Sequence, residues 1–278
     1  MTTQDEINTQ NAEFWNTLCG TGLARAIGIE DGSAESLTKF DEWYLAMYPY
    51  LLDRVPVATM DGKRVLEIGL GYGTLSQKLA AAGAIYNGLD IASGPVAMVN
   101  SRMDMLSLGG RAQQGNMLAC PFEDETFDCV VSIGCFHHTG DTQRCFDETL
   151  RVLKPGGYAY LMVYNQFSFR QWTNFPRETF RKMRKELAGY SRYERVAGTA
   201  AQRQAYDADL SGRAAPETDF FSVKQLGFML SGFSETTFNK ENADPITRHG
   251  GTIVVERVAL LGNLGHWAGL DIYIHAKK

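Results

Sequence analysis

Between residues 61 and 165, short apolar runs alternate with longer stretches of helical periodicity. The apolar runs are residues 65–68, 84–89, 128–133 and 158–163, and the helical stretches between them are 75–82, 95–108 and 142–153. Runs of apolar residues without regular polar interruption are typical of strands that are buried on both faces. Strands of this kind that alternate with helices form parallel sheets with helices on each side. The sequence therefore predicts an α/β fold with a mostly parallel sheet.

Local signals place the ends of several of these elements. Ser93 precedes Gly-Pro and Asp141 precedes Thr-Gln, so each is predicted to cap the helix that follows it. Residues 154–157, Lys-Pro-Gly-Gly, end a helix and lead the chain into a strand. Ser222 begins a capping-box pattern that opens a helix to about residue 230, and the alternating segment 270–275 predicts a late strand.

The character of the sequence changes on either side of this block, which divides the chain into four parts. Residues 1–60 have helical periodicity and many aromatic side chains, which favours an N-terminal helical lid. Residues 61–165 form the core, and residues 166–220 are polar and without strand signals, as expected of a helical insertion over the substrate side. Residues 221–278 are predicted to complete the sheet.

Composition narrows the class of protein. The 278 residues include 27 basic and 32 acidic side chains, so nucleic acid is not expected as a partner. No run approaches the roughly 18 consecutive apolar residues of a membrane span, and the polar start does not resemble a secretory signal. The five cysteines include no C-x-x-C pair, which favours free thiols. We expect a soluble cytoplasmic protein with no membrane partner.

A glycine-rich turn follows the first buried strand. Gly69, Gly71 and Gly73 alternate with other residues, and Asp90 follows Gly71 by 19 positions, at the end of the next strand. Glycines at such a turn let a ligand approach bare backbone. An acidic residue about 20 positions further on commonly binds the ribose hydroxyls of a nucleotide in Rossmann-type sheets. The spacing therefore predicts a site for an adenosine-containing ligand.

The turn differs from a dinucleotide-binding loop. The G-x-G-x-x-G pattern requires glycine at position 74, where this chain has threonine. Glu67 also places a carboxylate just before the loop, where it would repel a pyrophosphate but suit a cationic ligand.

The motif acidic-x-G-x-G-x-G, residues 67–73, resembles the first motif of the class I S-adenosylmethionine-dependent methyltransferases. Three further segments are similar to motifs of that family, in the same order: 115–122, 127–132 and 150–157. The resemblance implies a Rossmann-like, mostly parallel, seven-stranded sheet with helices on both faces. It also implies S-adenosylmethionine as the cofactor and S-adenosylhomocysteine as its product.

The resemblance assigns expected roles in cofactor binding. Glu67 would act near the methionine amino group by orienting the loop or a water molecule. The backbone of Gly69, Leu70 and Gly71 would pass beneath the methionine and ribose. Asp90 would bind the ribose. Side chains next to the adenine and carbonyls that receive the ammonium would come from the remaining members: Ile91, Asn116, Met117, Ile133 and Gly134. Asn116 stands where aspartate is more usual, and Ile91 and Met117 are equally explained as core residues.

His137 and His138 directly follow the fourth buried run, at the sheet edge where ligands bind in open parallel sheets. Methyl transfer from a sulfonium mainly requires alignment and exclusion of water, and a base helps when the acceptor is a hydroxyl. Either histidine is a candidate catalytic base, and a hydrogen-bonded loop histidine is the alternative. No second cluster of ligand residues accompanies them, so we predict no metal site.

Four residues are candidates for the acceptor side. Tyr44 and Tyr48 lie four apart on one helix face, where their rings could cover a sulfonium or simply pack on the sheet. Tyr164 follows the fifth strand and is predicted to line the acceptor pocket. Asp219 is a candidate acceptor residue, or a cap for the helix that begins near Ser222.

The function predicted from these features is methyl transfer to a small-molecule acceptor, at a hydroxyl oxygen. The [D/N]-P-P-[Y/F] element of enzymes that methylate nucleobase or glutamine nitrogen is absent after the fourth strand. Two alternatives stay open: methylation of nitrogen or sulfur in a small metabolite, and a regulatory protein that binds the cofactor without catalysis. The oligomeric state also stays open, a homodimer included.

Overall fold

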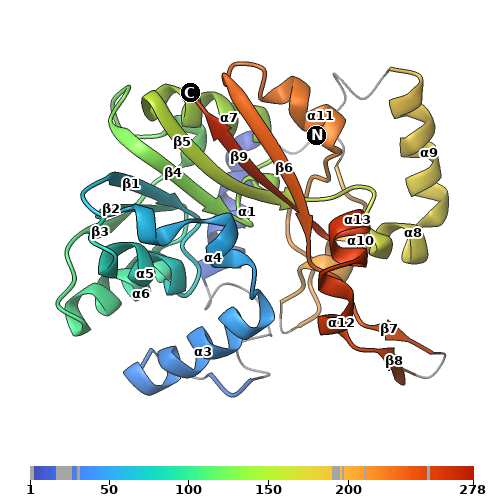
Figure 1. Cartoon of the computed structure of the whole chain (residues 1–278), viewed down its shortest axis with the longest axis horizontal. Helices are drawn as coiled ribbons and strands as arrows, with labels where there is room; N and C mark the ends of the chain where they lie inside the picture. Colours follow the sequence, from blue (N-terminus) through green and yellow to red (C-terminus); the bar gives the residue numbers. More distant parts are fainter. Residues whose placement is uncertain are drawn as a thin grey trace.

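The computed structural model describes residues 3–16, 27–29, 32–189, 195, 197–209, 211–248 and 251–278. Its centre is a seven-stranded sheet in the order β3-β2-β1-β4-β5-β9-β6 (Figure 1). The strands are β1 (Arg64–Ile68), β2 (Ile85–Asp90), β3 (Arg111–Gln114), β4 (Phe127–Ile133), β5 (Leu153–Tyr164), β6 (Glu235–Glu241) and β9 (Asp271–Lys277). The pairs among β1 to β5 are parallel, and β9 is antiparallel to both β5 and β6. The predicted α/β, Rossmann-like, mostly parallel sheet is confirmed.

Helices cover both faces of this sheet, as Figure 1 shows. One layer contains α5 (Thr74–Ala81) and α6 (Ser93–Met105), and the other contains α7 (Thr142–Val152) and α11 (Val223–Met229). The remaining described helices are α1 (Gln4–Asn16), α3 (Ala34–Met47), α4 (Leu51–Arg54), α8 (Phe169–Asn174), α9 (Pro176–Leu187), α10 (Ala200–Tyr206), α12 (Arg257–Leu261) and α13 (Leu264–Ala268), with the 3-10 turns η2 (Val57–Thr59), η3 (Met117–Ala119) and η4 (Phe136–His138).

Because side chains alternate along each strand, the sheet contributes to a hydrophobic cluster on each of its two faces. Val130 of β4 packs in the cluster that contains Phe146 of α7 and Leu226 of α11. Its neighbour Val131 packs in the cluster that contains Leu79 of α5 and Val99 of α6. Successive residues of a strand face opposite sides of the sheet, so an unbroken apolar run is what a doubly covered strand requires.

The order of the strands determines where a ligand can bind. β1 pairs with β2 on one side and with β4 on the other, so the chain direction across the sheet reverses at β1. A crevice forms at such a point beyond the carboxyl ends of the strands. The loops after β1, β2 and β4 all open into this crevice, and they carry the sequence motifs described above.

Two strands of the sheet have no clear sequence signal. β3 reads Arg-Ala-Gln-Gln, with only Ala112 buried, because it lies at one edge of the sheet. β6 lies at the other edge and reads Glu-Thr-Thr-Phe-Asn-Lys-Glu. β5 also begins at Leu153 rather than at 158 as predicted, after an irregularity in its pairing with β4 between Phe127 and Cys129.

The helix caps agree with the sequence in two of three cases. The side chains of Asp141 and Ser222 accept hydrogen bonds from the third residue of α7 and of α11, as predicted. The prediction for Ser93 is wrong, since Ala92 is the N-cap of α6 and its side chain makes no capping bond. A residue of α1 does this instead: the Oδ1 atom of Asn16 accepts from the Gly94 amide at 2.7 Å.

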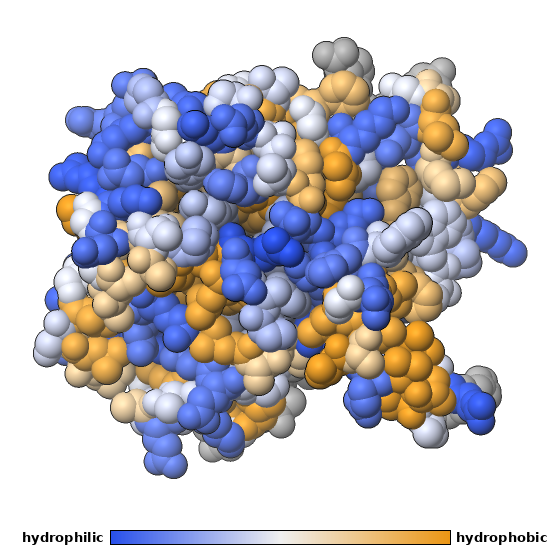
Figure 2. Space-filling model, in the orientation of Figure 1, coloured by the Kyte–Doolittle hydropathy of each residue, from blue (hydrophilic) through white to orange (hydrophobic). Residues whose placement is uncertain are grey.

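Residues 166–220 contribute α8, α9 and α10, which lie beside the sheet at the end of β5 (Figure 1). Beyond them, the short strands β7 (Ile246–Thr247) and β8 (Ile253–Val255) form a separate hairpin. Figure 2 shows apolar side chains on this part of the surface, among them the exposed Val254, Val258 and Trp267. Each helix in the described part of the chain is too short or too polar to span a bilayer.

Candidate functional site

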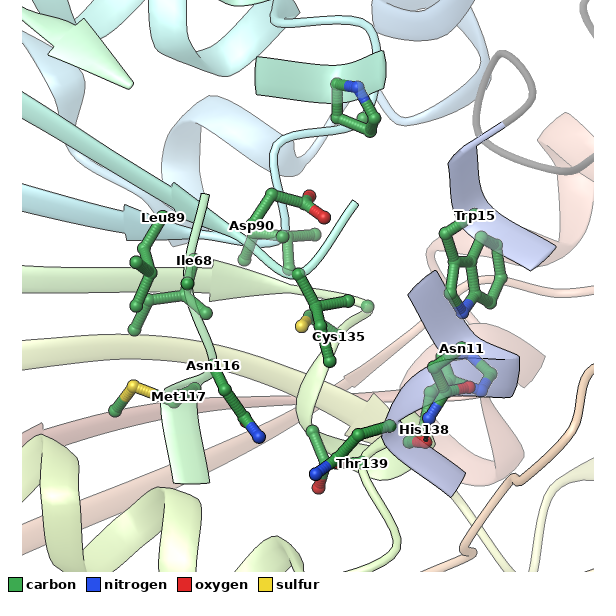
Figure 3. Close-up of a pocket in the computed structure, with 18 residues that line it drawn as sticks. Asn11, Trp15, Ile68, Leu89, Asp90, Asn116, Met117, Cys135, His138 and Thr139 are labelled. Atoms are coloured by element: carbon green, nitrogen blue, oxygen red, sulfur yellow. Dashed lines mark hydrogen bonds between the residues drawn. The ribbon is translucent and has the colours of Figure 1, made fainter. Parts of the chain in front are cut away.

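The crevice beyond β1, β2 and β4 contains the main cavity described here. Its walls come from the ends of these strands, from the loops that follow them and from α1 (Figure 3). Nine of the residues predicted from the sequence line it: Gly69, Gly71, Asp90, Ile91, Asn116, Met117, Ile133, Gly134 and His138. Residues from four separate segments of the chain thus lie around one space, which we call the donor cavity.

The turn after β1 can be built only with glycine at its first position. Gly69 has a φ of 78°, a conformation that residues with a Cβ atom rarely adopt. A Cβ atom there would lie within 2.4 Å of the Cβ atom of Cys135. Gly71 and Gly73 also have positive φ. The turn therefore presents bare backbone at the floor of the cavity and allows the loop after β4 to approach it.

Asp90 is held at the end of β2 by two backbone amides. Its Oδ2 atom accepts from the Leu70 amide at 2.8 Å, and its Oδ1 atom accepts from the Ala92 amide at 2.9 Å. Burial raises the pKa of this carboxyl, while the amides of Ala92 and Leu70 lower it. Each carboxylate oxygen keeps a further lone pair for a ligand donor, because an ionised carboxylate accepts about four hydrogen bonds.

Asn116 lies across the cavity from Asp90, at the end of the loop after β3 (Figure 3). Its Oδ1 atom accepts from the Leu118 amide at 2.9 Å and so caps the short helix η3. The amide nitrogen makes no hydrogen bond with the described residues and is therefore the group that can donate to a ring nitrogen of a bound base. The fold thus already uses the amide oxygen of Asn116 in a local hydrogen bond.

Glu67 faces away from the donor cavity, into the layer beneath the glycine turn. Its Oε2 atom accepts from the hydroxyl of Ser76 at 2.5 Å and from that of Tyr86 at 2.8 Å. Burial raises its pKa to about 7, although both hydroxyls lower it. Glu67 and Leu70 line a second cavity on the other side of the turn. In this arrangement Glu67 supports the turn from below.

The second cavity lies against α3. Its walls include Phe40, Trp43, Tyr44 and Tyr48, and it shares three backbone positions with the donor cavity: Gly69, Gly71 and Ile133. Tyr44 and Tyr48 pack ring to ring at 4.9 Å. Burial and the nearby Asp271 raise the pKa of Tyr48 to about 12. The two tyrosines therefore lie next to the donor cavity, on the other side of the glycine turn that forms its floor.

Helix α1 covers the donor cavity and belongs to residues 1–60, the segment expected to form an N-terminal helical lid. Asn8, Asn11 and Trp15 line the cavity. Figure 3 shows Asn11 and Trp15 on α1 at one side of it. The Asn11 side-chain nitrogen donates to the carbonyl of His138 at 2.7 Å, and the Trp15 ring lies 4.9 Å from the His138 ring. These residues are separated from the loop by more than 120 positions, so local sequence carries no signal of the contact.

The two histidines lie in different surroundings. His137 has no exposed surface, and neither ring nitrogen has a hydrogen-bond partner among the residues described. Burial, together with His138, lowers the pKa of His137 well below its usual range. His138 lines the donor cavity, and its Nδ1 atom lies 2.7 Å from the carbonyl oxygen of Glu217. Of the two, His138 is therefore the residue with access to a ligand.

Tyr164 and Asp219 lie outside both cavities. The Tyr164 ring packs 4.0 Å from the His137 ring, and its hydroxyl donates to the Oδ1 atom of Asp207 at 3.2 Å. Asp219 is buried and accepts two hydrogen bonds of 2.9 Å from the Arg195 guanidinium. The cap of α11 is Ser222, so Asp219 does not have that alternative role. Asp207 belongs to this region and was missed, because nothing in its sequence surroundings marks it.

Comparison with known proteins agrees with this geometry. A family model described as a methyltransferase domain matches residues 66–161. A fatty-acid O-methyltransferase of Mycolicibacterium smegmatis is 33% identical over 118 residues, which are 41% of this chain and 42% of that protein. A ubiquinone biosynthesis O-methyltransferase of Coxiella burnetii is 28% identical over 108 residues, 39% of this chain and 46% of that protein. The chain spans less than half the length of these two relatives.

A crystal structure of an S-adenosylmethionine-dependent methyltransferase from Methanosarcina mazei has the same fold. It superposes with a TM-score of 0.52 at 21% identity and covers 83% of this chain and 97% of that one. The family match falls on the strands and loops that form the donor cavity. Residues 66–161 therefore form a methyltransferase domain.

Proposed function

We propose that this protein binds S-adenosylmethionine in the donor cavity and transfers its methyl group to a hydroxyl oxygen of a small molecule. The observation that carries the proposal is the position of Asp90 beside the bare backbone of Gly69–Gly71. The fixed carboxylate suits the hydroxyls of a ribose. The exposed backbone lets the methionine part of the ligand lie directly on the turn.

The residues present fit this cofactor. Ile91 and Met117 offer apolar surface for a flat base, and the Asn116 amide nitrogen offers it a donor. Ile133 and Gly134 also line the cavity, and their backbone carbonyls are the acceptors that an ammonium group of the ligand would need. Bound there, S-adenosylmethionine would supply a methyl group carried on a sulfonium, and loss of that methyl group leaves a neutral thioether.

The chain's own residues then have two tasks. The cover formed by α1, with Trp15 and Asn11, keeps water from the donor and holds the loop that carries His138. The loop places His138 at the cavity wall, where an acceptor hydroxyl can be aligned behind the methyl group. Alignment of this kind supplies much of the rate, because the leaving group needs no protonation.

Oxygen is favoured over nitrogen or sulfur by two observations. An imidazole lies at the wall of the cavity, and a neutral hydroxyl, unlike an amine or a thiolate, gains from a base. Both curated relatives described above are O-methyltransferases by name. Those names also suggest the first acceptors to try, a long-chain fatty acid and a phenolic precursor of a quinone.

The test is a transfer assay with a methyl-labelled donor. The acceptors are fatty acids, phenols, sugars, amines and thiols of similar size, and Asp90→Asn is the inactive control. The proposal expects label in an oxygen-linked methyl group of at least one hydroxyl or carboxyl compound. Label only in amines or thiols would overturn the choice of oxygen. Tight donor binding without any product would instead favour a protein that binds the cofactor without catalysis.

A further inference from the structure

Two residues of the predicted cap, residues 166–220, lie within hydrogen-bonding distance of the Nδ1 atom of His138. The Nδ1 atom lies 2.7 Å from the carbonyl oxygen of Glu217 and 3.3 Å from the hydroxyl of Thr218. A backbone carbonyl only accepts hydrogen bonds, so Nδ1 must carry a hydrogen. In the neutral ring, the proton-accepting nitrogen is therefore Nε2.

A buried carboxylate lies next to this nitrogen. The Oδ2 atom of Asp207 is 3.6 Å from Nε2, and both side chains are almost fully buried. The other carboxylate oxygen accepts from the Tyr164 hydroxyl at 3.2 Å. Oδ2 is buried and has no hydrogen-bond partner among the residues described. The gap of 3.6 Å is too long for a direct hydrogen bond, so Nε2 stays free to accept one from a ligand.

The other charged groups near Asp207 have partners of their own. The Arg170 guanidinium donates to both carboxylate oxygens of Asp244, at 2.6 and 2.5 Å. Asp271, from β9, accepts from Asn242, and Asp219 accepts from Arg195. The remaining titratable groups packed around the pair are uncharged near neutral pH: Tyr48, His137, Tyr164 and Tyr206. His138 is thus the cation that Asp207 can stabilise most directly.

We propose that His138 accepts the proton of the acceptor hydroxyl at Nε2 and that Asp207 stabilises the imidazolium that forms. In this step the acceptor oxygen bonds to the methyl carbon, its O–H bond breaks and the proton moves to Nε2. The C–S bond breaks with its electron pair left on the sulfur. His138 is the catalytic residue, while Asp207 and the Glu217 carbonyl are positioning groups. This inference rests on the proposed function and extends it to the cap.

The inference assigns a role to a segment that the donor cavity alone does not explain. Asp207 and Glu217 belong to the cap, whereas His138 belongs to the loop after β4. The base is therefore complete only when the cap lies on the core. A carboxylate that orients a histidine and balances its charge is the general arrangement by which proteins raise the basicity of an imidazole.

The test uses the full chain with Asp207→Asn, and Asp209→Asn as its matched control. Asparagine preserves the size of the side chain and can still accept from Tyr164, while removing the charge. Asp209 lies two positions away and makes its ion pair with Arg213 at the surface. Asp207 does not line the donor cavity, so calorimetry with S-adenosylhomocysteine should give the wild-type affinity for both variants.

The first readout is turnover of the acceptor found by the transfer assay. A general base contributes about 10²- to 10⁴-fold, so we expect His138→Gln to lower kcat within that range. Asp207→Asn should lower kcat at least about ten-fold with little change in KM, and the acid limb of its pH profile should move to lower pH. The double variant should lose no more than His138→Gln alone. Unchanged kcat in Asp207→Asn would overturn the inference.

The second readout needs no acceptor. Nitrogen-15 NMR of the His138 ring reports which nitrogen carries a proton at each pH. Nδ1 should carry one throughout, and the nitrogen-15 signal of Nε2 should respond differently to pH in the wild type and in Asp207→Asn. Equal behaviour of Nε2 in the two proteins would overturn the pairing. If the wild type turns over no acceptor while this difference is present, the proposed function fails and the pairing stands.

Discussion

Glu67 shows that the sequence can place a residue of the donor motif without naming the partners of its side chain. The sequence places it at the end of β1, before the glycine turn, and there it lies. The carboxylate is nevertheless directed to Ser76 and Tyr86, beneath the turn. The partners of the Glu67 carboxylate are hydroxyl groups of α5 and β2. The tertiary fold brings these groups near, so the sequence of β1 does not reveal them.

The first prediction at this scale concerns the pH dependence of stability. Burial raises the pKa of Glu67 from 4.5 to about 7 in the folded protein. Between these values the unfolded chain loses a proton that the folded one keeps, so Glu67 makes the protein less stable as pH rises to about 7. In Glu67→Gln this loss is absent. We expect its stability relative to wild type to increase by up to about 3 kcal/mol between pH 4.5 and pH 8.

Denaturant unfolding at a series of pH values measures this difference. Glu123→Gln is the control, because Glu123 is exposed and its substitution should leave the pH dependence of the wild type unchanged. A constant difference between Glu67→Gln and wild type over this pH range would contradict the burial of a protonated Glu67.

Some residues of the site could be predicted because local sequence determines their position. Others could not, because their contacts are with residues distant in sequence. Gly69 and Asp90 belong to the first kind. The tight turn requires glycine at position 69, and Asp90 is the last residue of β2, so its carboxylate lies beside that turn. Asn11 and Asp207 act through contacts with His138, which is distant in sequence. Single-sequence reasoning has no access to such pairs. The roles assigned to the individual ligand-binding residues remain predictions.

At the scale of elements, burial pattern decided which strands could be predicted. The central strands β1 and β4 are buried along most of their length and were expected from their apolar runs. β3 and β6 lie at the edges of the sheet, where most of their side chains are at least partly exposed. Their sequences therefore resemble loops. Prediction of edge strands needs the partner strand, which the local sequence does not contain.

Helix α3 is joined to the core by a buried ion pair. The Arg102 guanidinium of α6 has almost no exposed surface and donates to both carboxylate oxygens of Asp41, at 2.8 and 2.9 Å. Thr74 of α5 donates to the same carboxylate. Removal of one partner from a buried pair leaves the other charge without compensation, which is strongly destabilising.

We therefore predict that Asp41→Asn lowers the free energy of unfolding by about 2 kcal/mol, below the full value for a buried pair because Asp41 is partly exposed. It should also loosen α3 and the second cavity. Asp53→Asn, on the exposed side of α4, is the matched control and should change stability by less than about 0.5 kcal/mol. Equal stability of the two variants would show that the pair does not hold α3.

For the whole molecule, the fold class and the location of the donor cavity followed from the alternation of strands and helices and from the glycine turn. The individual contacts of α1 and of the cap with His138 did not, because they depend on how segments outside residues 66–161 pack on the domain. Those segments vary in sequence independently of the domain's motifs. The division of the chain into lid, core, cap and final strands likewise remains a prediction.

Affinity for S-adenosylhomocysteine, measured by titration calorimetry on the folded full chain, tests the central claim most directly. We expect one ligand per chain and a raised melting temperature in its presence. Asp90→Asn should weaken binding at least about ten-fold, because the ribose loses a charged acceptor. Asp104→Asn, an exposed carboxylate on the neighbouring helix, should bind as the wild type does. Absence of binding to the folded wild type, or equal binding by Asp90→Asn, would contradict the account.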